Sequence, residues 1–189
     1  YDATGPSVTV DQAGTQSDPT SALPIEFTIV FSEAIDPATF AAGDITQSGT
    51  ATGITWSLAT SDNITWTLSA TAVTGEGTLV PSLGAGVVTD TTGNGNSAST
   101  STDNSVTYDA TGPSVTVDQA GTQSDPTSAL PIEFTIVFSE AIDPATFAVG
   151  DITQSGTATG ITWSFATSDN ITWTLSATAV NGEGTLVPR

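Results

Sequence analysis

Carboxylates are the only ionisable side chains that this chain carries in number. Its 189 residues include 20 Asp and Glu against a single Lys or Arg, with no His and no Cys. Nucleophile–base pairs and Schiff bases need His, Cys or Lys, so this chain lacks the residues for both kinds of catalysis. Paired carboxylates can hydrolyse glycosides, but the acids fall in short turns with no evident cleft. We therefore expect no enzymatic activity.

Clustered carboxylate oxygens suit a hard cation, and Ca²⁺ takes about 6–8 oxygen ligands. The segment 90–96 resembles a calcium loop, although it lacks the full EF-hand pattern. The alternative is that Glu33 caps backbone amides and the other acids are solvated turn residues, because Asp and Asn favour turns for local reasons. The candidate metal ligands are Asp2, Glu33, Asp90, Asn94, Asp109, Glu140 and Asp143.

The sequence is a tandem repeat, in which Tyr1 returns as Tyr108. Residues 1–82 and 108–189 are identical at 78 of 82 positions. We expect two domains, residues 1–107 and 108–189, each close to the usual size of a domain with its own core. The second copy is expected to be incomplete and to lack its C-terminal strands, because residues 83–107 have no counterpart after Arg189. The differences are Ala42/Val149, Leu58/Phe165, Thr74/Asn181 and Ser82/Arg189.

Short alternating segments predict β-strands throughout the repeat. Residues 25–31 alternate apolar and polar side chains with a period of two, and segments 54–58 and 64–68 form a predicted hairpin. About seven strands separated by turn residues predict an all-β fold, with one β-sandwich in each copy. The remaining strands are expected at Val8 and Val10, at residues 44–47, at residues 79–88 with bends at Pro81 and Gly84, and at Val106 and Tyr108.

Alternating strand directions bring the candidate ligands to one end of the sandwich. The turns that contain Glu33, Asp62 and Asp90 should gather there together with the incoming linker residue Asp2. Glu33 also continues the inward-facing parity of residues 25–31, so its carboxylate needs a partner. Like charges repel and no cation is near, so we expect Ca²⁺ at the junction between the copies. The corresponding acids of the second copy are Asp109, Glu140, Asp143 and Asp169.

The tryptophans allow two interpretations. Trp56 and Trp66 share strand parity with the apolar residues Ile54, Leu58 and Ile64, which favours packing in the core. The alternative is an exposed platform for carbohydrate, which would require the hairpin to lie uncovered at a sheet edge.

The order of several short motifs resembles bacterial immunoglobulin-like repeats of large surface and secreted adhesins, which are often exported by type I secretion. The matching motifs are Phe31-Ser32-Glu33-Ala34-Ile35, Phe40, Asp44-Ile45-Thr46, Val88-Thr89-Asp90 with Gly93-Asn94, and the junction Tyr108-Asp109-Ala110-Thr111-Gly112-Pro113. This resemblance implies tandem immunoglobulin-like sandwiches, a spacer or adhesive role and, in several branches, calcium between domains. It identifies no ligand.

Composition narrows the partners and the location. A net charge of −19 disfavours nucleic acid and anionic membrane surfaces, and no apolar run reaches the roughly 20 residues that span a bilayer. The lack of Cys agrees with a secreted or cell-surface bacterial protein that uses no disulfides. We expect a structural spacer of an adhesin, stiffened by calcium and contacting its neighbouring repeats. The alternative is a module that binds a glycan or a host protein.

Overall fold

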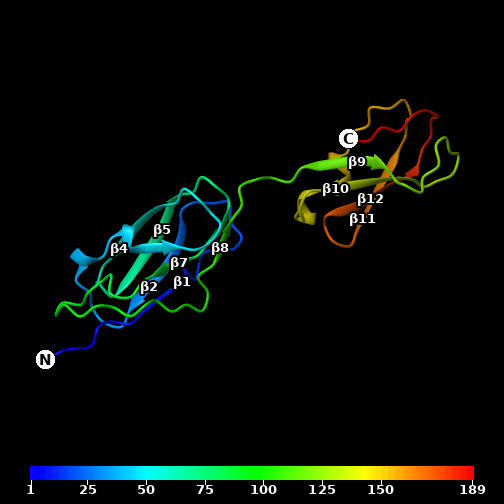
Figure 1. Ribbon diagram of the computed structural model, residues 1–189. Helices are drawn as coiled ribbons and strands as arrows, with labels where there is room; N and C mark the ends of the chain where they lie inside the picture. The colour runs from blue at the N-terminus through cyan, green and yellow to red at the C-terminus, as the bar shows by residue number, and fades with distance from the viewer. The chain divides into compact units, whose positions relative to one another are not determined.

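The computed structural model describes all 189 residues, which form two compact units, Tyr1–Ala110 and Thr111–Arg189 (Figure 1). The regular elements are β-strands and four short 3₁₀ turns, with no α-helix, which confirms the all-β prediction. No helix has the length and apolar character required to cross a bilayer. The sequence repeat begins at Tyr108, but this residue ends a strand of the first unit, and the second unit starts three residues later.

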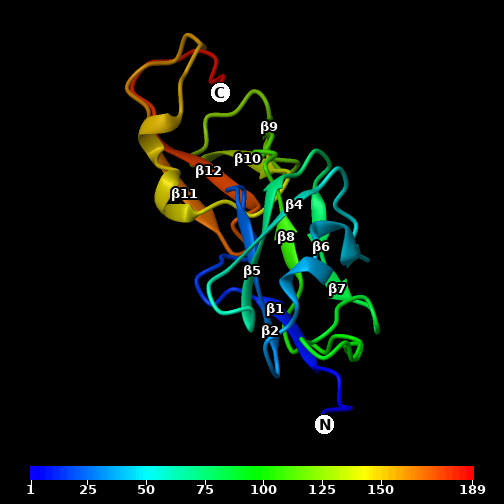
Figure 2. The same ribbon diagram turned by 90° about the vertical axis from the view of Figure 1, so that its left-hand side faces the viewer.

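The first unit contains eight short strands. Four of them form an antiparallel sheet in the order β1-β2-β5-β4, and two further pairs, β3 with β7 and β6 with β8, form small sheets (Figures 1 and 2). The strands are β1 (Val8–Gln12), β2 (Ile25–Phe31), β3 (Ile45–Gln47), β4 (Thr55–Thr60), β5 (Thr65–Ala72), β6 (Gly77–Leu79), β7 (Pro81–Leu83) and β8 (Val106–Tyr108), with 3₁₀ turns η1 (Pro37–Thr39) and η2 (Ala42–Asp44).

Alternation along β2 builds the core of this unit. Ile25, Phe27, Ile29 and Phe31 are at most 1% exposed, whereas the intervening side chains are half-buried or exposed. Residues of the two small sheets and of the loop after them join the same apolar cluster. The arrangement is therefore sandwich-like, with the four-stranded sheet on one side of the core.

The strand predicted over residues 79–88 is wrong in its extent. The chain changes partner at Val80: β6 pairs with β8, whereas β7 pairs with β3. The side chain of Gln47 occupies the break, since its Oε1 accepts the N–H of Val80 at 2.7 Å and its Nε2 donates to the carbonyl of Thr78 at 3.0 Å. After Leu83 the chain leaves the sheet and turns through Gly86, whose φ is +74°.

The second unit repeats only the four-stranded sheet, in the order β11-β12-β10-β9. Its fully buried apolar side chains are fewer and centre on Ile136 and Leu175. Near the end of the chain, Pro188 makes a single bridge to Gln154 rather than a strand pair. The elements are β9 (Val115–Gln119), β10 (Ile132–Phe138), β11 (Thr162–Thr167) and β12 (Thr172–Ala179), with η3 (Pro144–Thr146) and η4 (Val149–Asp151).

The tryptophans belong to the core, as their strand parity predicted. Trp66 and Trp173 are 6% and 5% exposed, and the half-buried Trp56 packs edge-on against Phe27 with ring centroids 6.0 Å apart. Neither Trp66 nor Trp173 presents a ring face to solvent that a sugar could cover.

Candidate metal-binding site

Three turns of the first unit meet at one end of the sandwich, as the alternation of strand directions predicted. Ile35, after β2, donates its N–H to the carbonyl of Asn63 in the β4–β5 turn at 3.0 Å. The next residue, Asp36, donates its N–H to the carbonyl of Thr89 at 2.9 Å. These backbone bonds hold the start of the 90–96 loop against the end of β2.

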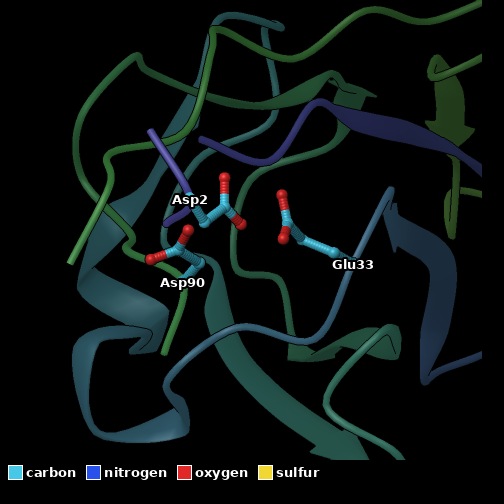
Figure 3. Close-up of side chains that lie close together, drawn as sticks. All are labelled: Asp2, Glu33 and Asp90. Carbon is cyan, nitrogen blue, oxygen red and sulfur yellow. The ribbon is translucent and has the colours of Figure 1, made fainter. Parts of the chain in front are cut away.

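Three carboxylates meet at this end. Oxygens of Asp2, Glu33 and Asp90 all lie within 4.8 Å of one another, and Figure 3 shows the side chains of Asp2 and Glu33 facing each other beside Asp90. Two oxygens bound to one Ca²⁺ at about 2.4 Å can be at most about 4.8 Å apart. The cluster therefore has a spacing that a metal ion could bridge.

Asp90 is the buried member of the cluster, at 3% exposed. Its Oδ1 accepts the N–H groups of Thr92 and Asn94, both at 2.8 Å, and its Oδ2 accepts the Asn94 side-chain amide at 2.8 Å. Burial acts to raise the pKa of Asp90, but the hydrogen bonds from Asn94 and Thr92 outweigh it and lower this pKa to about 2. Asp90 therefore carries a negative charge at the buried side of the site.

The other two carboxylates are less engaged. Asp2 is exposed, and its Oδ1 accepts the N–H of Thr4 at 3.0 Å. Glu33 is half-buried at the end of β2 and caps no backbone amide, contrary to the alternative interpretation of this residue. The oxygens of Glu33 are therefore available to a cation.

A close approach of two glycines delivers Asp2 to the site. A Cβ at Gly5 would overlap the carbonyl oxygen of Gly95, so only glycine lets the entering linker lie on the 90–96 loop. The contact continues with Ser97, which donates its N–H to the carbonyl of Pro6 at 3.0 Å. Asn94 also reaches the linker, with its side-chain amide 3.4 Å from the carbonyl of Asp2.

Asn94 and Asp143, two further predicted ligands, have local structural roles. Asn94 organises the loop around Asp90 through its amide, as described above. Asp143 accepts the N–H of Ala145 at 2.9 Å and so caps η3, and Asp36 caps η1 in the same way. These two aspartates match the interpretation of solvated turn residues.

The second predicted set does not form a cluster within either unit. Asp109 belongs to the first unit, where its N–H donates to the carbonyl of Thr20 at 3.0 Å, whereas Glu140 and Asp143 belong to the second. Glu140 is the counterpart of Glu33, but no residue of the chain corresponds to Asp90 in the second copy. A metal ion bound by this set remains a prediction.

Sequence reasoning missed the roles of Asp11 and Asp18 at the other end of the first unit. Asp11 Oδ1 accepts the N–H groups of Thr102 and Asp103 at 2.7 and 3.0 Å, which lower its pKa. Asp18 Oδ1 accepts the N–H of Thr107 at 2.8 Å. Both aspartates fasten the last segment of the unit, about 90 positions further along the chain, and no local pattern signals such a contact.

No protein-family model matches this chain, and no curated protein matches it significantly.

Proposed function

We propose that this chain is a spacer of a large bacterial surface or secreted adhesin, built from immunoglobulin-like repeats and stiffened by Ca²⁺. The observation that carries this proposal is the near-identity of two copies that fold as separate compact units. Domains that each bury their own core add length when they are joined in tandem. The length of an array increases with copy number, whereas an enzyme needs only a single active site.

The acidic cluster supplies the metal part of the proposal. Ca²⁺ bound by Asp2, Glu33 and Asp90 would neutralise mutual repulsion in a chain of net charge −19. Asp2 precedes the first strand, so an ion there would tie the entering linker to the 90–96 loop. Asp109 holds the equivalent position in the linker between the copies, but the second copy contains no counterpart of Asp90, so the same coordination would restrict bending only where the following repeat includes that loop.

The absence of His, Lys and Cys supports a role without catalysis, because the side-chain nucleophiles and bases of most hydrolases are missing. The neighbouring repeats are then the partners of the chain, and the outside of the cell is its location.

The test combines calorimetry and small-angle scattering of the whole chain with Ca²⁺ and with EDTA. We expect Ca²⁺ to raise the melting temperature of the first unit. A change in the maximum dimension of the chain would show that Asp109 and Glu140 also hold an ion at the linker. Mg²⁺ at the same concentration is the control, since its preference for near-octahedral, hydrated sites suits this cluster less well. If neither observable changes between Ca²⁺ and EDTA, the calcium role is wrong.

A further inference from the structure

The first strand and the closing segment of the first unit lie side by side and run in the same direction. Thr9 of β1 and Thr100 form a parallel bridge. Thr100 donates its N–H to the carbonyl of Val8 and accepts the N–H of Val10, both at 3.0 Å. This is the hydrogen-bond pattern of a parallel strand pair.

The pairing continues in the same register on both sides of this bridge. Before it, Ser97 donates its N–H to the carbonyl of Pro6 at 3.0 Å. After it, Gln12 donates its N–H to the carbonyl of Asp103 at 2.6 Å. Segments 6–12 and 97–103 therefore form one parallel ladder, which joins residues close to the two ends of the unit.

The carboxylate of Asp11 completes this ladder. Its Oδ1 accepts the N–H groups of Thr102 and Asp103 at 2.7 and 3.0 Å, so these two amides donate to a side chain rather than to a backbone carbonyl. The hydroxyl groups of Ser101 and Thr102 lie 3.2 Å from the same oxygen. Hydrogen bonds to a charged acceptor are stronger than those between neutral groups, so Asp11 strengthens the contact between the two segments.

The chain enters and leaves this unit at opposite ends. Tyr1 precedes β1 at one end, and β8 leads out of the unit at the other (Figure 1). Tension applied through the two ends therefore pulls β1 and segment 97–103 in opposite directions along their common axis. The hydrogen bonds of the ladder are then loaded together, in shear, rather than one after another.

The rest of the unit holds both members of the ladder in place. β1 pairs with β2 on its other side, and β8, which follows segment 97–103, pairs with β6. Thr107 of β8 also donates its N–H to Asp18 Oδ1 at 2.8 Å and accepts the N–H of Thr20 at 2.9 Å. Neither segment can slide without breaking several hydrogen bonds at once.

We propose that the ladder of segments 6–12 and 97–103, completed by the Asp11 carboxylate, is a mechanical clamp that resists tension along the chain. This inference rests on the proposed spacer function, because a spacer of a surface adhesin is pulled at its two ends. Asp11 is a positioning residue of the clamp. The first unit unfolds under tension when the ladder breaks, while the hairpin of β4 and β5 is still folded.

The first experiment stretches the whole chain between handles at its two ends by single-molecule force spectroscopy. EDTA is present, so the result does not depend on bound Ca²⁺. The first unit is the longer of the two, so its unfolding releases more chain and can be recognised in each trace. We expect Asp11→Ala to raise the unfolding rate of the first unit at constant force about tenfold or more, because two hydrogen bonds to a charged acceptor are lost.

Asp62→Ala is the matched control. Asp62 Oδ1 also accepts two backbone N–H groups, those of Ile64 and Thr65 at 2.9 and 2.8 Å, but it lies in the β4–β5 turn outside the ladder. Urea denaturation should show that both variants lose stability. Under tension, Asp62→Ala should unfold at the rate of the wild type, because its hairpin is still folded when the ladder breaks.

The direction of pulling gives a second test that leaves the ladder unchanged. The chain has no cysteine, so Thr91→Cys provides a single attachment point at an exposed position of the 90–96 loop. With the other handle at Tyr1, both handles lie at the N-terminal end of the ladder, and the force opens its hydrogen bonds one after another. We expect the ladder to open at a force several-fold lower than in end-to-end pulling.

Two results would overturn the clamp. One is an increase of the unfolding rate that is absent in Asp11→Ala or equal in Asp62→Ala, and the other is an equal opening force in the two pulling directions. If Asp11→Ala does not fold, the comparison of pulling directions decides alone. Either result would leave the calorimetric and scattering test of the spacer unaffected, and a failure of that test would not change the forces measured in EDTA.

Discussion

The side-chain amide of Asn94 donates to Asp90 Oδ2 at 2.8 Å, while the backbone N–H of the same residue donates to Oδ1 at 2.8 Å. One residue therefore binds both oxygens of a carboxylate that is 3% exposed. A buried carboxylate that stays ionised needs such donors or a cation. The loop supplies the donors, and the two neighbouring carboxylates add charge on the open side.

The low pKa of Asp90 predicts acid sensitivity of the first unit. A folded pKa of about 2 lies below the ordinary aspartate value of about 3.9. Ionised Asp90 therefore contributes stability that is complete above about pH 4 and is lost as the pH falls through about 2. In Asp90→Asn, we expect the first unit to be less stable than the wild type at pH 7, with a difference that shrinks as the pH falls and disappears near pH 2.

This difference can be measured by urea denaturation followed through the amide signals of Val88 and Asn96. Both residues lie in the segment 83–107, which occurs once in the chain, so their signals report the first unit alone. Equal acid sensitivity of the wild type and of Asp90→Asn would contradict the assigned role of the Asp90 charge.

The two copies provide a matched pair for the metal proposal. Glu33→Gln removes one charge from the acidic cluster, and Glu140→Gln makes the same change where no counterpart of Asp90 exists. We expect the first variant to weaken calcium affinity about tenfold or more, because Ca²⁺ strongly prefers charged ligands, and the second to leave it unchanged. Isothermal titration of the whole chain with Ca²⁺ measures both. Equal affinities in the two variants would remove Glu33 from the site.

Local sequence patterns predicted the strands that have one buried face and one more exposed face. β2 and β5 alternate buried and less buried residues along their lengths, so sequence periodicity alone located them. The division between β6 and β7 was not predictable, because it depends on Gln47 satisfying the backbone on both sides of Val80. Partner exchange of this kind arises from contacts far apart in sequence, and no local pattern encodes it.

The candidate site was predictable to a similar degree. Strand alternation placed Asp2, Glu33 and Asp90 at one end, and the structure brings them together. Sequence patterns could not show that Asn94 donates to Asp90 or that Gly5 lies against Gly95. Both contacts depend on the conformation of the 90–96 loop, which has no repeating pattern. Asp109 was predicted as a ligand because its position matches that of Asp2. The second copy contains no counterpart of Asp90, so the same cluster does not form there.

Gly5 and its second-copy counterpart Gly112 are a matched pair that tests the contact between the entering linker and the 90–96 loop. A Cβ at Gly5 would overlap the carbonyl of Gly95, whereas Gly112 has no neighbour within 4 Å. We expect Gly5→Ala to destabilise the first unit by about 1–3 kcal/mol, as overpacking does, and to weaken calcium binding by moving Asp2. Gly112→Ala should change stability by less than about 0.5 kcal/mol. Chemical denaturation measures both, and an equal effect of the two substitutions would refute the close approach.

The greater exposure of apolar residues in the second unit predicts that the two nearly identical four-stranded sheets differ in local stability. Phe27 and Leu79 have no exposed surface, while Phe134 is 8% exposed and Leu186 is half-buried. Less apolar surface is therefore removed from water in the second copy, and local opening of β11 and β12 should be easier than opening of β4 and β5. We expect amide hydrogens of β12 to exchange at least about tenfold faster than those of β5.

Mass spectrometry can distinguish the copies only through peptides that include a sequence difference. Peptides over residues 56–70 and 163–177 differ by Leu58 and Phe165, so each copy has its own mass. Equal exchange in the two copies would mean that the greater exposure of the apolar residues does not weaken the second sheet.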